Sequence, residues 1–181
     1  VQNPGCLLSP ECQEWTMFQP GSYWVYLNEK TQSSDCTYYK HGLYYNKENF
    51  YNGIHEYNWF FVNSNMFIKF SLAGAENGNV LTVSLPNFQD LIALAQKSLV
   101  DSVTCDSVPG IYTYKLVEKL PFLTLNGNSY TNVVHTKSRL QNSDIYSYDF
   151  YWVKNIGIIY FKKNYNLHDT AWSLTRWHVN Q

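Results

Sequence analysis

Hydrophobic and polar residues alternate along much of this chain with a period of two, which is the spacing of β-strands. Between positions 66 and 72, Met66, Ile68 and Phe70 fall on one face while Phe67 and Lys69 fall on the other. This alternation is typical of a sheet with one packed face. Aromatic and β-branched residues predict further strands at 22–27, 35–39, 57–62, 80–85, 111–120, 130–137, 145–154, 156–163 and 171–179.

The predicted strands are joined mostly by short polar links, which favour antiparallel neighbours. Residues 63–65 (Asn-Ser-Asn) and 126–128 (Asn-Gly-Asn) are typical of hairpin turns. One segment has helical spacing instead. Apolar residues recur three and four positions apart between positions 87 and 100, with Asn87 as the N-cap. We therefore expect one helix there, packed on the sheet.

These patterns predict a mainly β protein with about nine strands and one packed helix. The sheet is expected to be curved and antiparallel, and the pattern leaves open whether it forms an open sheet, a half-barrel or a barrel. Residues 1–21 are predicted to form an irregular arm pinned by a disulfide, and residues 22–181 one β-rich domain. A length of 181 residues suits a single domain with a sizeable core.

The charge pattern excludes several classes of function. Thirteen basic and fourteen acidic residues are spread along the chain, so the sequence lacks the basic patch of a nucleic-acid-binding protein. No apolar run approaches the roughly 18 residues that span a bilayer. Aromatic residues make up 18% of the chain and charged residues only 15%, which excludes a disordered segment.

Four cysteines, Cys6, Cys12, Cys36 and Cys105, predict two disulfides and an oxidising compartment. Three pairings are possible. We favour Cys6–Cys12, a tight local loop, together with Cys36–Cys105. Free buried thiols are the main alternative. The cysteines and the five histidines lack the spacings of zinc ligands, so neither a metal nor another cofactor is expected.

The two ends of the chain resemble small exported lipoproteins of the Bacteroidota. Residues 20–26 (PGSYWVY) and 34–37 (SDCT) look like their opening strands, and residues 130–134, 146–160 and 172–174 like their closing strands. The chain departs from the pattern at Asn155-Ile156, where a second glycine is common. The resemblance implies an exported, lipid-anchored, β-rich protein of the bacterial outer membrane, with the anchoring cysteine upstream of Val1. It transfers no catalytic residue.

Catalytic motifs are missing from the sequence. It has no G-x-S-x-G elbow and no phosphate-binding glycine loop. Acidic residues that could form a glycosidase pair lie on or beside predicted strands, but their spacing brings no two together: Asp35, Glu56, Glu118, Asp144 and Asp149. We therefore expect a non-catalytic protein and keep a hydrolase as the less favoured alternative.

The aromatic residues are the strongest candidates for binding. Runs such as 59–61 and 150–153 place rings on both faces of a strand, which predicts a helix, a partner or a ligand on each side. The candidate contacts are Trp59, Phe60, Phe61, Tyr151, Trp152, Trp172 and Trp177. The leading hypothesis is an accessory subunit or protein-binding module of the cell envelope. The alternative is a binder of a lipid-like molecule or a glycan.

Overall fold

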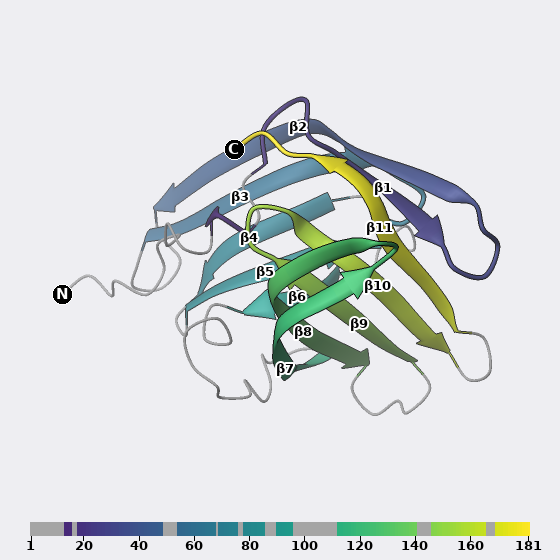
Figure 1. Cartoon of the computed structure of the whole chain (residues 1–181). Coiled ribbons are helices and arrows are strands. Elements are labelled where there is room, and N and C mark those ends of the chain that lie inside the picture. Colours follow the sequence, from purple (N-terminus) through teal and green to yellow (C-terminus); the bar gives the residue numbers. More distant parts are fainter. Residues whose placement is uncertain are drawn as a thin grey trace.

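The computed structural model contains one antiparallel sheet of eleven strands (Figure 1). It describes residues 13–15, 18–48, 54–67, 69–75, 78–85, 90–95, 112–140, 146–165 and 169–181. The strands are β1 (Tyr23–Asn28), β2 (Ser34–Glu48), β3 (Ile54–Asn63), β4 (Lys69–Ala75), β5 (Gly78–Ser84), β6 (Asp90–Ala95), β7 (Tyr112–Leu125), β8 (Asn128–Leu140), β9 (Tyr146–Val153), β10 (Gly157–Tyr165) and β11 (Thr170–His178).

The strand order is β6-β5-β4-β3-β2-β1-β11-β10-β9-β8-β7. Strands that follow each other in the sequence pair with each other, except for β6 and β7, which are the two edges, and β1 also pairs with β11 at the centre of the sheet. The sheet is curved, and Cα atoms of β6 come within 8 Å of those of β7 and β8. No hydrogen-bonded ladder joins the edge strands β6 and β7 in the described residues, so the sheet is open. The structure confirms the expected curved antiparallel sheet. It does not support a closed barrel.

The expected helix at 87–100 is not observed. Residues 90–95 form strand β6, which pairs with β5 through partners such as Val83 and Leu91, and the rest of the segment lies outside the described residues. A short apolar run such as Leu91-Ile-Ala-Leu-Ala95 fits either a helix or a buried strand. Here pairing with β5 supplies the backbone hydrogen bonds and overrides the helical propensity.

The core is built from the inward-facing residues of the strands. In β9, Tyr148, Phe150 and Trp152 are buried, while the residues between them are partly exposed. Phe150 and Phe67 pack on Phe161 with ring centroids 5.2 and 5.4 Å away. The alternation seen in the sequence therefore separates a buried face from a partly solvated one.

Side chains of β1 also bind to β10 and to the turn before it. The Tyr26 hydroxyl donates to the carbonyl of Ile158 at 2.8 Å, and the Trp24 indole donates to the carbonyl of Ile156 at 2.7 Å. Gly157 follows with a φ of +96°, and a Cβ there would lie 3.0 Å from Cζ of Phe18. The turn between β9 and β10 is thus packed closely against β1 and the segment before it.

Cys36 on β2 has an exposed side chain and a free thiol, so the structure does not show the expected Cys36–Cys105 disulfide. Cys6, Cys12 and Cys105 lie outside the described residues, as does most of the predicted arm 1–21. The Cys6–Cys12 bridge therefore stays a prediction.

Candidate functional site

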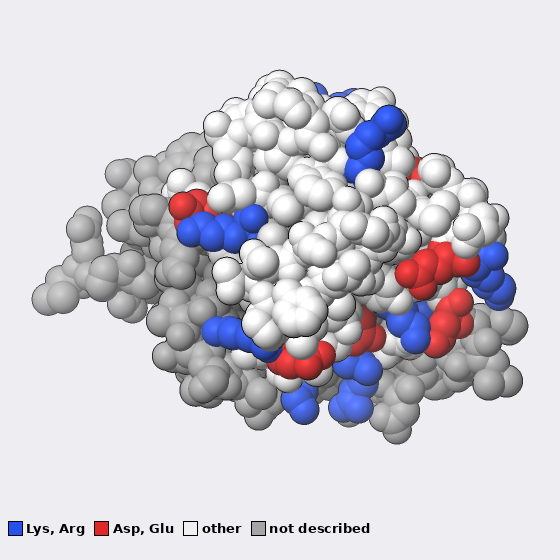
Figure 2. All heavy atoms as spheres, in the orientation of Figure 1, with Lys and Arg blue, Asp and Glu red and all other residues white. Residues whose placement is uncertain are grey.

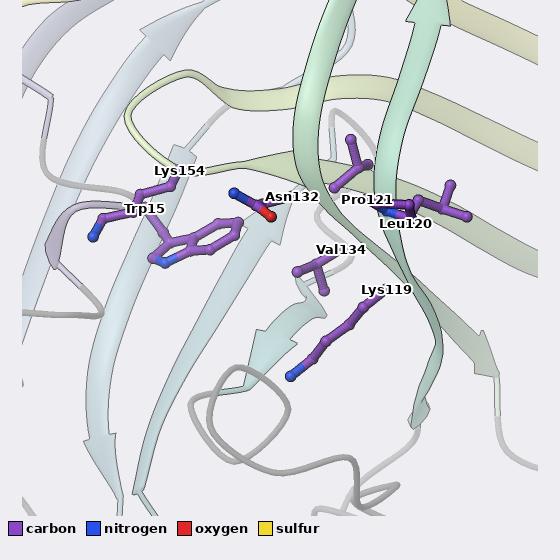
Figure 3. Close-up of a pocket in the computed structure, with 8 residues that line it drawn as sticks. Trp15, Lys119, Leu120, Pro121, Asn132, Val134 and Lys154 are labelled. Carbon is purple, nitrogen blue, oxygen red and sulfur yellow. The ribbon is translucent and has the colours of Figure 1, made fainter.

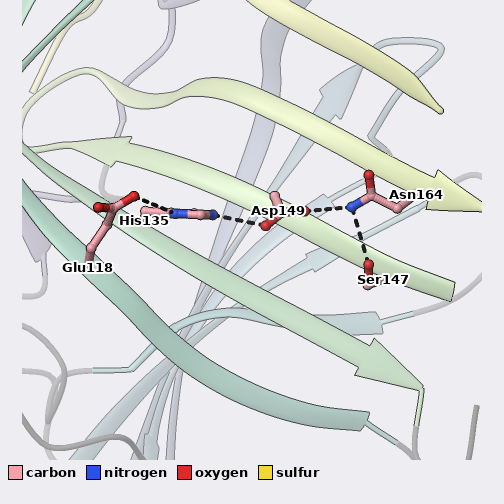
Figure 4. Close-up of polar contacts among 5 residues, drawn as sticks. All are labelled: Glu118, His135, Ser147, Asp149 and Asn164. Carbon is pink, nitrogen blue, oxygen red and sulfur yellow. Dashed lines mark hydrogen bonds and ion pairs between the residues drawn. The ribbon is translucent and has the colours of Figure 1, made fainter. Parts of the chain in front are cut away.

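A polar network crosses four strands on the partly exposed face of the sheet (Figure 4). His135 on β8 lies between two carboxylates, with Nδ1 3.2 Å from Oε1 of Glu118 on β7 and Nε2 2.9 Å from Oδ1 of Asp149 on β9. The Asn164 amide on β10 donates to the second oxygen of Asp149 at 2.6 Å and to the Ser147 hydroxyl at 3.2 Å. These contacts tie β7, β8, β9 and β10 together.

Both ring nitrogens of His135 lie within hydrogen-bonding distance of a carboxylate oxygen. An ionised carboxylate only accepts hydrogen bonds, so each contact is a hydrogen bond where the ring nitrogen carries a hydrogen. The His135 side chain is 10% exposed and that of Asp149 14%, whereas that of Glu118 is 47% exposed. The strong contact is therefore the one between His135 and Asp149, and the contact with Glu118 is weakened by water.

Burial and charge shift the pKa values of the groups around His135. Burial alone would raise the pKa of Asp149, but the hydrogen bonds from His135 and Asn164 and the positive charge of Lys137 outweigh it and hold the pKa below its ordinary value. Burial, followed by the charges of Asp149 and Glu118, raises the pKa of Tyr151. Burial is also the main cause that raises the pKa of Tyr160 to about 12. Both phenols are neutral near pH 7.

The network is suited to holding strands together more than to chemistry. Both ring nitrogens of His135 already face a carboxylate, and its side chain is only 10% exposed, which leaves little access for a substrate. Glu118 and Asp149 are two of the acids considered for glycoside hydrolysis. They lie on either side of the His135 ring, which fills the space between them (Figure 4). In the described part of the chain, no group of three His, Cys, Asp or Glu residues could hold a metal ion.

A second feature is a set of exposed apolar residues along β7, the edge strand that forms a hairpin with β8. Phe122 is 68% exposed and Val117 42% exposed, and Pro121 beside Phe122 is also exposed. Val117 occupies a β-bulge, because Leu116 pairs with Thr136 and Glu118 with His135. We call Val117, Pro121 and Phe122 the β7 surface.

A pocket of about 400 Å³ lies beside the β7–β8 hairpin (Figure 3). Its apolar lining comes from Trp15, Leu120, Pro121, Val133 and Val134. Its polar lining comes from Lys119, Asn132 and Lys154. Lys119 pairs with Val134 in the ladder directly after Glu118 pairs with His135.

The structure separates the predicted aromatic contacts. Trp152 is fully buried in the core. Phe61 on β3 is partly exposed and stacks on His41, with centroids 4.6 Å apart. Tyr151, Trp172 and Trp177 are partly buried and pack against the core, where Trp172 stacks on Phe161 at 5.3 Å. Trp59 and Phe60 belong to β3, and their side chains lie outside the described residues.

Sequence reasoning missed the residues that the structure brings together. His135 was considered only as one of five histidines, and Phe122 was not considered as an exposed residue. One signal in the sequence could have indicated this cross-strand network. Polar residues recur at every second position of neighbouring strands, as do His135 and Lys137 on β8 beside Asp149 on β9. Asp35, another candidate acid, instead accepts a hydrogen bond from the Ser64 hydroxyl at 2.7 Å and supports the turn after β3.

No protein-family model and no curated protein matches this chain. Two solved structures from the Bacteroidota are similar to it. One is a predicted lipoprotein of Parabacteroides distasonis, with 8% identity and a TM-score of 0.46, covering 88% of this chain and 96% of that chain. The other is a predicted exported protein with a YmcC-like fold from Bacteroides fragilis, with 8% identity and a TM-score of 0.48, covering 89% and 97%. Neither likeness is close enough to transfer a function.

Proposed function

We propose that this chain is a non-catalytic, exported protein of the bacterial cell envelope that binds a partner protein through the β7 surface. The observation that carries this proposal is the exposure of Phe122, a residue of an edge strand that is 68% exposed. Large aromatic residues dominate the binding energy of many protein interfaces. A partner that covers an exposed phenyl ring removes apolar surface from water, and this stabilises the complex.

The charge distribution around the β7–β8 hairpin supports the same proposal. The hairpin lies in front of β9, β10 and β11 in Figure 1, and Figure 2 shows this face from the same side. Lysine, arginine and acidic side chains gather along its rim, and a broad central area carries almost none. Interfaces between proteins often have this arrangement of an uncharged centre and a polar rim.

The edge position of β7 adds a further argument. In the described residues β7 pairs only with β8, so its other side has no strand partner. Proteins often protect such edges with bulges and prolines. The bulge at Val117 and the proline at position 121 interrupt this edge. They disfavour open-ended pairing with other strands, and they leave docking through side chains such as Phe122 as the favoured mode.

Photo-crosslinking tests the proposed partner surface. A benzoylphenylalanine at position 122 should give one discrete crosslinked product in native envelopes. The same probe at Lys30, an exposed residue of the turn after β1, is the matched control and should give none. Equal products from both positions, or none from either, would overturn the proposed surface.

Export is a separate part of the proposal and has its own test. The terminal motifs that resemble exported lipoproteins support it. The full-length gene product should fractionate with membranes and incorporate labelled palmitate. Recovery in the cytosolic fraction without label would refute export and lipid anchoring, while the crosslinking result would still decide the partner surface.

A further inference from the structure

We infer that the face of β2, β1 and β11 that is turned away from the core binds an acidic glycan, a sugar chain that carries carboxylate groups. These three strands lie side by side at the centre of the sheet (Figure 1). The site shares no residue with the β7 surface, so it adds a second binding function to the proposed one. We call its central residues the β1 surface: Tyr23, Tyr38, Arg176 and His178.

The strand register places three rings of the β1 surface in one row. Tyr23 pairs with Tyr38 on β2 and with His178 on β11. The next residue of β1, Trp24, is buried in the core, and successive residues of a strand point to opposite faces. The row therefore faces outward. Tyr38 is 45% exposed, and the ring centroids of Tyr23 and His178 lie 5.9 Å apart with 30° between the planes.

A second pair of rings lies next to this row, on β2 and β3. His41 pairs with Phe61, and their rings stack with centroids 4.6 Å apart. Phe61 precedes Val62, a buried residue of the core, so Phe61 and His41 are on the outward face. The aromatic area thus extends over the four neighbouring strands β3, β2, β1 and β11.

Rings of this kind suit a sugar chain. Tyrosine and histidine combine a flat apolar body with a polar tip. A pyranose ring likewise has a flat face of C–H groups and a rim of hydroxyl groups, so it can stack on these rings and form hydrogen bonds with their tips. The β7 surface differs, because Val117, Pro121 and Phe122 have no polar side-chain atom.

Arg176 supplies a positive charge next to the row of rings. It lies two positions before His178 on β11, so about 7 Å separates their Cα atoms. Arg176 is exposed, and no described residue forms a hydrogen bond or ion pair with its side chain. Its planar guanidinium group therefore keeps its N–H donors for a ligand, and it matches the two oxygens of a carboxylate.

The other charges of this region also favour an anionic chain. Neither β1 nor β11 contains an aspartate or a glutamate. Asp35 of β2 pairs with the buried Tyr26, so it lies on the opposite face. Lys40, the extra residue at the bulge between Tyr39 and His41, is exposed and has no ion pair among the described residues. The described part of this face thus has positive charge without a competing carboxylate.

Calorimetric titration with three probes tests the inference: hexagalacturonate, its fully methyl-esterified form and polyglutamate. Esterification removes the carboxylate charges and keeps the sugar chain, whereas polyglutamate keeps the charges and has no sugar rings. We expect hexagalacturonate to bind most tightly, the ester about tenfold more weakly, and polyglutamate not at all.

The charged contact is tested with Arg176→Gln. This change should weaken the binding of hexagalacturonate about tenfold and leave the binding of the ester unchanged, because only the contact with a carboxylate is lost. Lys30→Gln, in the turn after β1, removes another exposed positive charge and is the matched control. It should bind all probes like the wild type.

The stacking contact is tested with Tyr38→Ala, which should weaken the binding of both sugar probes about tenfold. Tyr38→Phe keeps the ring and should retain most of the affinity. Phe122→Ala removes an equally large exposed ring from the β7 surface and should have no effect. Equal affinity for the acid and the ester, tight binding of polyglutamate, no binding of any probe, or equal effects of Tyr38→Ala and Phe122→Ala would overturn the inference. None of these results would change the crosslinking test of the β7 surface.

Discussion

The imidazole ring of His135 lies parallel to the phenol ring of Tyr151, with centroids 4.1 Å apart and 11° between the planes. The two residues face each other across the β8–β9 ladder. The Tyr151 ring covers one side of the imidazole, while the Glu118 and Asp149 carboxylates lie next to its two ring nitrogens. The His135 ring is thus held on the sheet by contacts in several directions.

We expect His135→Ala to lower the free energy of unfolding by about 2–4 kcal/mol. The change removes the main partner of Asp149, a largely buried carboxylate, and breaking such a pair is costly. Urea denaturation at pH 7 measures the loss. His41→Ala is the matched control, because His41 also stacks on an aromatic ring, that of Phe61, but is exposed. It should cost about 1 kcal/mol or less. Equal losses would show that the carboxylate contacts contribute little.

Asp149 should make the fold sensitive to acid. Burial raises the pKa of its carboxyl group, but the contacts with His135, Lys137 and Asn164 outweigh this effect and lower the pKa below the ordinary value. A carboxyl group with a lowered pKa in the folded state stabilises the protein above its unfolded pKa of about 4. The stabilisation is lost as the pH falls through the folded value.

Asp149→Asn should therefore be less stable than the wild type near pH 7 and lose less stability on acidification below about pH 4. Urea denaturation at a series of pH values compares the two slopes. Asp169→Asn is the control, since Asp169 pairs with Lys162 at 2.7 Å on the surface and is half exposed. Its acid slope should stay close to that of the wild type. An unchanged slope in the Asp149 variant would contradict the assignment.

Gly157→Ala should destabilise the protein by about 2–3 kcal/mol, which a lowered thermal midpoint would report. The new methyl group would meet Phe18 at 3.0 Å, and the φ of +96° disfavours any side chain. Gly127→Ala separates the two causes, because Gly127 also has a positive φ of +78° but open space around it. We expect about 1 kcal/mol there. A loss at Gly127 as large as at Gly157 would remove the packing against Phe18 from the explanation.

The thiol of Cys36 should react with iodoacetamide in the folded, unreduced protein, because its side chain is exposed and free. Peptide mass spectrometry after labelling identifies the modified residue. Cys36→Ser should keep the wild-type thermal midpoint, since no disulfide is lost. A peptide joined to Cys105 in the unreduced digest would instead restore the bridge expected from the sequence.

Local pattern predicted much of the fold. The aromatic run at 22–27 corresponds to β1 (Tyr23–Asn28), and the turn at 126–128 joins β7 and β8 as expected. These elements depend on neighbouring residues, which a sequence displays directly. The helix prediction at 90–95 was wrong because local pattern alone cannot decide such a segment. Its apolar residues suit a helix as well as a strand, and only the pairing with a neighbouring strand distinguishes the two.

The candidate sites could not be predicted in the same way, because they depend on register. The bulge at Val117 shifts the ladder by one residue and brings Glu118 opposite His135. Without that bulge, alternation would point the Glu118 side chain to the other face. The pocket likewise requires Trp15, far along the chain from β7 and β8, to lie against their hairpin.

Pairing of β1 with β11 also determines how the molecule can assemble during folding. The strands on either side, β2 to β6 and β7 to β10, are each continuous in sequence and can form by successive hairpins. Their union requires residues such as Val25 and Thr175, which are 150 positions apart, to meet. Closing so long a loop is entropically costly and slow. The central seam should therefore be the last part of the sheet to form, and its closure should limit the folding rate.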